Sequence, residues 1–214
     1  MINSNYCEKF GCVPKTRLKQ LMLLELREED LKLAIILHDE IISPNIEAIT
    51  SNFYKQILKN KDVREIFSHG FSIGNLKKTQ TTYLLSLGIN FNDPTYFNNR
   101  LYVGHIHARI GIKPTLYQCS FRILQDLIIQ RIPINHPGFT ELLQFVLKIT
   151  TLDMTLAIHA YEYELTDSIA HNPQSNNFNS SDEIQIDRSV DPSTFLASKP
   201  YIILNFSVDA LKSK

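Results

Sequence analysis

The stretch from Val103 to Pro114 constrains the fold more than any other, because it marks the end of one helix and the start of the next. Gly111 follows an apolar helical turn and can adopt the positive φ that ends a helix. Pro114 cannot continue that helix but suits the first turn of a new one. Beyond it, apolar residues recur at steps of four, three and four: Tyr117, Phe121, Leu124 and Ile128. This spacing predicts the apolar face of a second helix.

Two histidines lie near the end of the first of these helices. Residues two apart on a helix point roughly 200° apart, so His105 and His107 cannot both face one site. His107 shares its face with Gly104 and Ile110, whereas His105 shares its own with Arg109. Imidazole is a common metal ligand and is equally common on partly buried helix faces. Spacing alone therefore leaves open whether either histidine binds a metal.

A set of residues at fixed spacing surrounds His107, and it comprises Val103, Gly104, Arg109, Ile110, Gly111, Pro114 and Tyr117. This set resembles the proximal-histidine signature of globin-coupled sensors. In that family the histidine three residues after the glycine is the proximal ligand of haem iron, so the resemblance assigns that role to His107 rather than His105. Leu116 departs from the pattern, because the family often has tryptophan there. The departure affects packing more than ligation.

Composition narrows the class of protein. The 214 residues carry 22 basic and 22 acidic side chains, so net charge gives no argument for nucleic-acid binding. No apolar run approaches the roughly 18–20 residues that span a membrane, and residues 1–10 lack the apolar core of a signal peptide. Three cysteines without CxxC spacing favour free thiols in a reducing compartment. We therefore expect a cytoplasmic protein that binds neither nucleic acid nor membrane.

Helical periodicity runs from about residue 17 to residue 165, which predicts an all-α domain over that range. Residues 1–16 are predicted to be a flexible N-terminal segment. Residues 166–214 are predicted to be a polar linker with a short C-terminal extension. Roughly 50 residues are too few for a catalytic output domain such as a diguanylate cyclase, so we expect no enzyme in this chain.

Within that domain, two details of the first helices follow from spacing. One apolar face is predicted from Leu18, Leu21, Met22 and Leu26. The helix after the acidic group at residues 28–30 is predicted to end or kink at Pro44.

Tyr54 lies on an amphipathic helix whose apolar positions are Ile46, Ile49, Phe53 and Ile57. Spacing alone makes Tyr54 a tyrosine at the edge of the core, with its hydroxyl reaching solvent. The resemblance implies a distal-pocket role, because a Phe–Tyr pair on this helix places the hydroxyl where it can donate a hydrogen bond to oxygen. By resemblance, Leu76 and Thr79 line the same pocket. The Thr79 hydroxyl can equally bond back to its own helix.

Two further residues are candidates for the haem propionates. His69 directly precedes the helix of Leu76, and it can meet a propionate or remain a solvated loop histidine. Arg100 lies on the His107 helix, and it can serve a propionate or belong to an exposed charged face.

The last two helices, from Pro114 and over about residues 139–163, are apolar on more than one face, which predicts burial on several sides. Together they can form an antiparallel pair that packs against a second copy. The family resemblance implies the same homodimer.

The resemblance thus implies a globin-like fold around one haem b that senses oxygen, or CO or NO, and signals through the dimer helices to an output partner. Three alternatives remain. One is a haem globin for O2 storage or NO detoxification, which would need an electron source. Another is a haem-free globin-like interaction module. The third is an unrelated helical bundle.

Overall fold

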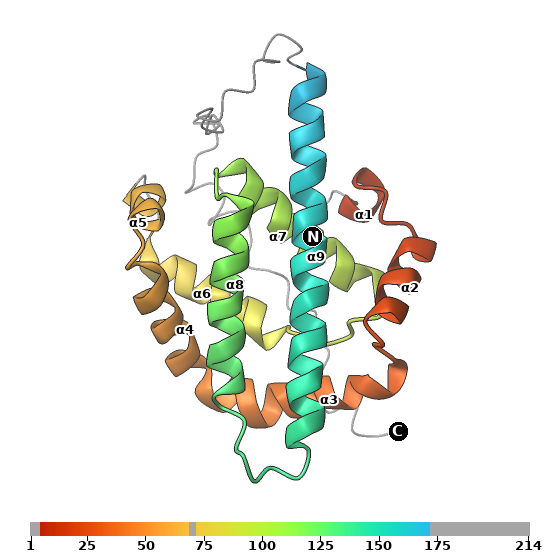
Figure 1. The fold of residues 1–214 in the computed structure, drawn as a ribbon, viewed down its shortest axis with the longest axis vertical. Coiled ribbons are helices and arrows are strands. Elements are labelled where there is room, and N and C mark those ends of the chain that lie inside the picture. Colours follow the sequence, from red (N-terminus) through yellow and green to blue (C-terminus); the bar gives the residue numbers. More distant parts are fainter. Residues whose placement is uncertain (1–4, 69–71, 172–214) are drawn as a thin grey trace.

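The computed structural model of the chain describes residues 5–68 and 72–171, with side chains placed up to Asp167. Every regular element in this part of the chain is helical, which confirms the predicted all-α fold (Figure 1). The α-helices are α1 (Tyr6–Lys9), α2 (Pro14–Leu23), α3 (Leu31–Ile36), α4 (Ser43–Ile57), α5 (Lys61–Ser68), α6 (Ile73–Leu85), α7 (Pro94–Arg109), α8 (Pro114–Ile129) and α9 (Phe139–His171). A 3-10 turn (Glu28–Asp30) precedes α3, and a π-helical segment (Leu37–Ile42) joins α3 to α4.

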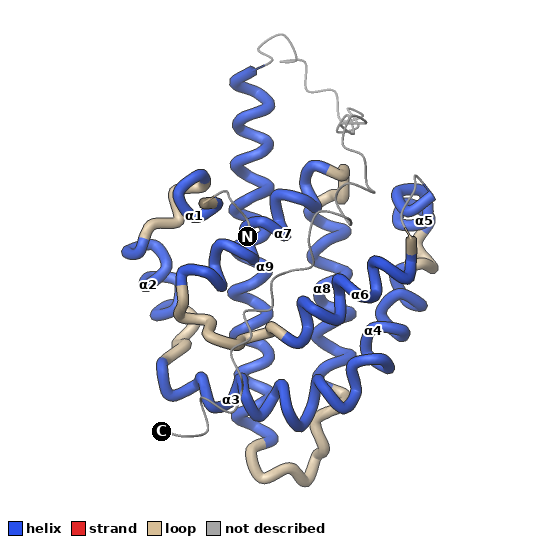
Figure 2. The backbone as a smooth tube through the Cα atoms, turned by 180° about the vertical axis from the view of Figure 1, so that it is seen from behind, coloured by secondary structure: helices blue, strands red, loops and turns tan. Residues whose placement is uncertain are grey.

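The core lies where α7, α8 and α9 meet. Figure 1 shows α8 and α9 side by side and joined by a loop at one end, and Figure 2, seen from the other side, shows α6 and α7 crossing in front of them. On the other side of α8, α4 packs against both α8 and α6. The helix α5 lies at the edge and has few contacts with the rest of the described chain.

The crossing of α7 and α9 is set by Gly104. A Cβ atom at this position would lie 2.5 Å from the Cα atom of Ala157 and 2.7 Å from its carbonyl oxygen. The two backbones can approach this closely only because residue 104 has no side chain. Gly104 therefore fixes the position of α7 one turn before His107.

The predicted corner between α7 and α8 is confirmed. Gly111 has a φ of +79°. Its N–H donates to the Ala108 carbonyl at 3.1 Å, and the Ile112 N–H donates to the His107 carbonyl at 3.0 Å. Pro114 then begins α8. This arrangement ends α7 within one turn of His107 and starts α8 alongside it.

The N-terminal segment differs from its prediction. The short helix α1 packs on α7, within the segment that the sequence predicted to be flexible: the Tyr6 N–H donates to Asn98 Oδ1 at 2.6 Å, and Phe10 is 3% exposed. A helix of four residues is too short to show a periodic pattern. In α2, Leu21 is buried as predicted, but Leu18 and Met22 are 60% and 68% exposed. The predicted apolar face of α2 is therefore only partly correct.

Pro44 lies in the first turn of α4, so the helical path does not end at this residue as one form of the prediction had it. The π-helical segment before it runs directly into α4. A wider π-helical turn leaves room for the proline ring. It also accommodates the hydrogen bond that is missing because proline has no backbone N–H.

Among the described residues, one stretch, Phe139–Asp167 in α9, is long and apolar enough to cross a membrane by length and composition. Half of its most apolar window is buried within the fold, as in a core helix. The sequence has no continuous apolar run of this length, because Lys148 and Asp153 interrupt it. The buried side of α9 includes Leu142, Phe145, Ile149, Leu152 and Leu156.

Candidate functional site

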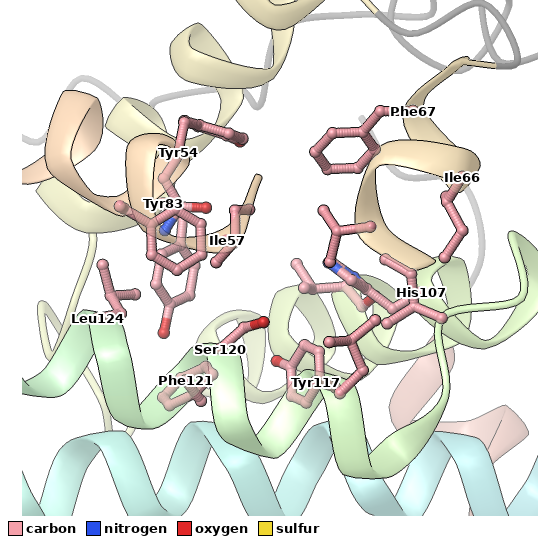
Figure 3. A pocket seen from close by; sticks show the side chains of 16 residues that line it. Tyr54, Ile57, Ile66, Phe67, Tyr83, His107, Tyr117, Ser120, Phe121 and Leu124 are labelled. Carbon is pink, nitrogen blue, oxygen red and sulfur yellow. The ribbon is translucent and has the colours of Figure 1, made fainter. Parts of the chain in front are cut away.

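A cavity of about 110 Å³ lies between α4, α5, α6, α7 and α8. Figure 3 shows its walls, which are mostly aliphatic and aromatic with a few polar groups. The lining residues are Phe53, Tyr54, Ile57, Val63, Ile66, Phe67, Gln80, Tyr83, Val103, His107, Ile112, Leu116, Tyr117, Ser120, Phe121 and Leu124. Such a wall excludes water and leaves a small number of polar groups to orient a ligand.

His107 is held in one orientation within this wall. Its Nδ1 lies 2.8 Å from the Val103 carbonyl oxygen, one helical turn earlier, so Nδ1 carries the proton and donates it to that bond. The Tyr117 ring meets the imidazole edge-on, with 5.0 Å between ring centroids. Burial lowers the pKa of His107 more than this hydrogen bond raises it, so the ring is neutral. Nε2 is left as the basic nitrogen, which is the form that binds a metal.

His105 lies on the other side of α7. Its Nδ1 is 2.8 Å from Glu164 Oε1 on α9, and its ring packs against Tyr6 and Phe10 of the N-terminal segment. It does not line the cavity. The two histidines thus occupy different faces, as the helical spacing predicts.

Tyr54 is buried in the α4 wall and is 6% exposed. Burial raises the pKa of its hydroxyl, which therefore stays protonated and remains a hydrogen-bond donor. Tyr54 and His107 reach the cavity from different walls, on α4 and α7 (Figure 3). The structure thus brings these two predicted site residues to one cavity.

The helix α6 presents other residues to the cavity than those expected. Gln80 and Tyr83 line it, whereas Leu76 and Thr79 do not. The Thr79 hydroxyl donates to the Asn75 carbonyl at 3.2 Å, which is the alternative left open for it. Gln80 and Tyr83 follow Leu76 by four and seven residues, so the apolar spacing of α6 carries a signal for this face. His69 lies outside the described residues.

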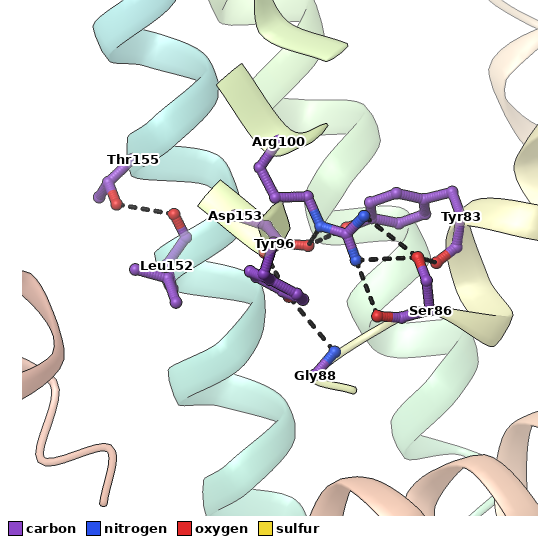
Figure 4. Close-up of polar contacts among 8 residues, drawn as sticks. All are labelled: Tyr83, Ser86, Gly88, Tyr96, Arg100, Leu152, Asp153 and Thr155. Carbon is purple, nitrogen blue, oxygen red and sulfur yellow. Dashed lines mark hydrogen bonds and ion pairs between the residues drawn. The ribbon is translucent and has the colours of Figure 1, made fainter. Parts of the chain in front are cut away.

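Arg100 is neither on an exposed face nor free for a propionate, because it belongs to a buried polar cluster (Figure 4). Its Nε lies 2.8 Å from Asp153 Oδ2 on α9, and its guanidinium also donates to the Ser86 carbonyl at 2.9 Å. The Tyr83 and Tyr96 hydroxyls donate to Asp153 at 2.8 and 2.6 Å. Tyr83 therefore belongs both to the cavity wall and to this cluster, and through it the cavity connects to α9.

Comparison with known proteins identifies the family. A family model described as Protoglobin matches residues 15–167. The chain belongs to the protoglobin family. Over 147 residues it is 24% identical to the heme-based aerotactic transducer HemAT of Halobacterium salinarum, which covers 63% of this chain and 30% of that protein. The chain thus spans less than a third of the length of this relative.

A solved structure supports the same fold. The globin domain of a Geobacter sulfurreducens globin-coupled sensor aligns with a TM-score of 0.61 and 19% identity. The alignment covers 67% of this chain and 96% of that domain. The architecture of the protoglobin domain is therefore that of a sensor globin.

The donor set of this protoglobin fits a haem. A neutral imidazole with a free Nε2 faces an apolar, aromatic cavity, as a haem pocket requires. No cluster of three or more His, Cys, Asp or Glu side chains in the described part of the chain would hold a bare metal ion instead. A cavity of 110 Å³ is smaller than a porphyrin, so a wall must move for haem to enter. The wall with the fewest contacts is α5.

Proposed function

We propose that this protoglobin domain binds haem b through Nε2 of His107 and senses a diatomic gas, oxygen first, with CO and NO as other ligands. The hydrogen bond from His107 Nδ1 to the Val103 carbonyl is the observation that carries the proposal, because it fixes the ligating form of the ring. The relative in Halobacterium salinarum is named a heme-based aerotactic transducer, which supports oxygen as the ligand.

When bound, haem supplies an iron centre with one open coordination position for a gas. The residues of the chain do the rest. Val103 and Tyr117 orient the His107 ring, and the aliphatic and aromatic wall keeps water out. The buried Tyr54 hydroxyl stays protonated and would donate a hydrogen bond to a bound gas, and in an apolar site such a bond is stronger than in water.

Signalling rests in this proposal on a second copy of the chain. The outward side of α9 exposes Leu147 and Leu165, which are 39% and 57% accessible. Packing this side together with α8 against a second copy would bury these side chains in a four-helix interface. Gas binding would then change the packing of that interface and pass the signal to an output partner, such as a diguanylate cyclase.

The test is the visible absorption spectrum of the purified full chain, with His107→Ala and His105→Ala as a matched pair. His107→Ala should lose the haem Soret band or bind haem far more weakly, because it removes the proposed iron ligand. His105→Ala should keep the band, since that ring faces Glu164. Unchanged haem content in His107→Ala would remove the proposed ligand. Absence of haem after reconstitution of the unmodified chain would favour a haem-free interaction module.

Tyr54→Phe tests the gas-binding half of the proposal. Loss of one hydrogen bond of about 0.5–1.5 kcal/mol should speed oxygen dissociation roughly 2- to 13-fold. Stopped-flow measurement gives the rate, and an unchanged rate would exclude Tyr54 from the distal site.

A further inference from the structure

Two cysteines meet at the end of α1, outside the haem pocket. The Cys12 N–H donates to the Cys7 carbonyl at 2.7 Å, and the Gly11 N–H donates to the Glu8 carbonyl at 3.1 Å. Gly11 has a φ of +66°. Together these features form a Schellman motif, in which the side chains at two positions commonly contact each other. Cys7 and Cys12 occupy those two positions. In most such motifs that contact is between apolar side chains, whereas here it joins two thiols.

The surroundings of this pair favour reactivity over packing alone. Cys7 and Cys12 are 6% and 0% exposed, and they lie at the floor of a cleft that Arg17, Pro94 and Asn98 also line. Cys7 Sγ lies 3.7 Å from the Pro94 carbonyl oxygen at the start of α7. The Arg17 guanidinium donates to the Cys12 carbonyl at 3.0 Å, which holds a positive charge beside the thiols. Both cysteines are free thiols.

From this geometry we propose that Cys7 and Cys12 form a redox-active dithiol, which hydrogen peroxide oxidises to a disulfide and a cellular thiol reductant restores. A metal site is a poorer explanation, because no third ligand of suitable type joins the pair within the described residues. The proposal does not depend on haem binding.

The two thiols have different roles in the oxidation. The hydrogen bond from Cys12, with the charge of Arg17, lowers the pKa of Cys7 to about 7 despite burial. The hydrogen bond to Cys7 and burial raise the pKa of Cys12. Cys7 is therefore about half thiolate at pH 7 and attacks first, and Cys12 is the resolving thiol.

The reaction balances. The Cys7 thiolate attacks one peroxide oxygen, the O–O bond breaks, and Cys7 sulfenic acid forms with release of hydroxide. This hydroxide takes up the Cys12 proton and becomes the first water. The Cys12 thiolate then attacks the Cys7 sulfur, the S–O bond breaks, and the oxygen leaves as hydroxide. That hydroxide takes up the proton that Cys7 first gave to solvent, so two thiols and one peroxide yield one disulfide and two waters.

Oxidation would act on the helix that carries His107. The N-terminal segment is attached to α7 by the hydrogen bond from Tyr6 to Asn98, and Cys7 contacts the first residue of α7. A disulfide would close the corner between α1 and α2 covalently and redirect Cys7 Sγ from the Pro94 carbonyl toward Cys12. The chain would thereby have a second chemical input at the opposite end of α7 from His107.

The experiment uses the full chain with Cys119→Ser, which removes the exposed third thiol and prevents cross-linking between molecules. After treatment with equimolar hydrogen peroxide, mass spectrometry should show the loss of two hydrogen atoms in the peptide that contains residues 7–12, and dithiothreitol should reverse it. Cys12→Ser should instead give sulfenic or sulfinic acid at Cys7. If both thiols remain open to alkylation after peroxide, the pair is only packing and the proposal is wrong.

A second measurement avoids variants that disturb the buried pair. The rate of Cys7 alkylation by iodoacetamide should follow a titration with its midpoint near pH 7. At pH 7 the alkylation rate should be about sixfold higher than for a thiol of pKa 9 with equal access. The thiolate fraction is roughly 50-fold larger, and the intrinsic nucleophilicity of the thiolate is about eightfold lower. Arg17→Gln should move the midpoint upward while far-UV circular dichroism stays the same. An unmoved midpoint near pH 9 in both proteins would overturn the assignment of Cys7.

Discussion

Replacing Asp153 by alanine should destabilise the protein by about 3–5 kcal/mol, because it leaves a buried charge without its partner. The Arg100 and Asp153 side chains are 4% and 1% exposed and lie 2.8 Å apart. The Tyr83 and Tyr96 hydroxyls would also lose the acceptor that they reach at 2.8 and 2.6 Å. An isolated buried hydroxyl costs about 1–3 kcal/mol, but rearrangement and water entry make these costs less than additive.

The assay is urea unfolding of the apoprotein, followed by far-UV circular dichroism. The midpoint should fall while the slope of unfolding free energy against urea stays the same. At about 2–4 °C per kcal/mol for a domain of this size, the melting temperature should fall by roughly 6–20 °C.

A double variant separates the buried charge from simple loss of packing. Arg100→Met with Asp153→Leu removes both charges and keeps most of the volume, so it should be considerably more stable than Asp153→Ala alone. The reasoning is refuted if Asp153→Ala costs less than about 1 kcal/mol, or if the double variant is no more stable than the single one.

Three further predictions test the frame around the cavity. Gly104→Ala should lower the free energy of unfolding in urea by at least about 1–3 kcal/mol, because its Cβ would overlap the Ala157 backbone. The control Gly74→Ala has nothing nearer than 3.7 Å, so it should be neutral or stabilising by up to about 1 kcal/mol. Apoprotein stability should fall as pH drops below about 6.5, because burial lowers the pKa of His107 in the folded state and only the unfolded chain gains the proton; His107→Leu should reduce this slope, which for one proton is at most about 1.4 kcal/mol per pH unit. Truncation after His171 should leave the haem-to-protein ratio unchanged, since the cavity lies within residues 53–124; a loss of haem would place part of the site beyond residue 171.

The separation of the two histidines could be predicted from the sequence because it depends on one helix only. A step of two residues turns the side chain by roughly 200°, and Gly111 and Pro114 fix where that helix ends. The structure confirms the different faces and the corner. The ligand role of His107 stays a prediction that the haem measurements test.

The residues of α6 that reach the cavity could be predicted only in part. Leu76, Gln80 and Tyr83 recur at steps of four and three, so the sequence places all three on one face of the helix. It does not show which turns of that face reach the cavity, because this depends on the length and path of the connection before α6. The cavity is lined by Gln80 and Tyr83 and not by Leu76.

The partner of Arg100 was beyond sequence reasoning for another reason. Asp153 is 53 residues away in the chain and lies on a helix whose apolar residues surround most of its circumference. No local pattern distinguishes a carboxylate that enters the core from one that faces solvent. Only the crossing of α7 and α9 brings the two groups together.

These contacts determine which helices can move together if a gas does bind at the cavity. The Gly104 contact and the buried pair of Arg100 with Asp153 both tie α7 to α9, and separating them would expose or unpair a buried charge. Beyond the backbone corner at Gly111, His107 meets α8 by a ring contact with Tyr117, which holds no buried charge pair. We therefore expect α7 and α9 to shift as one unit relative to α8. A gas would favour one of two arrangements of these helices only if it made different contacts in each. The shift would change the angle between α8 and α9, the two helices proposed to pack against a second copy.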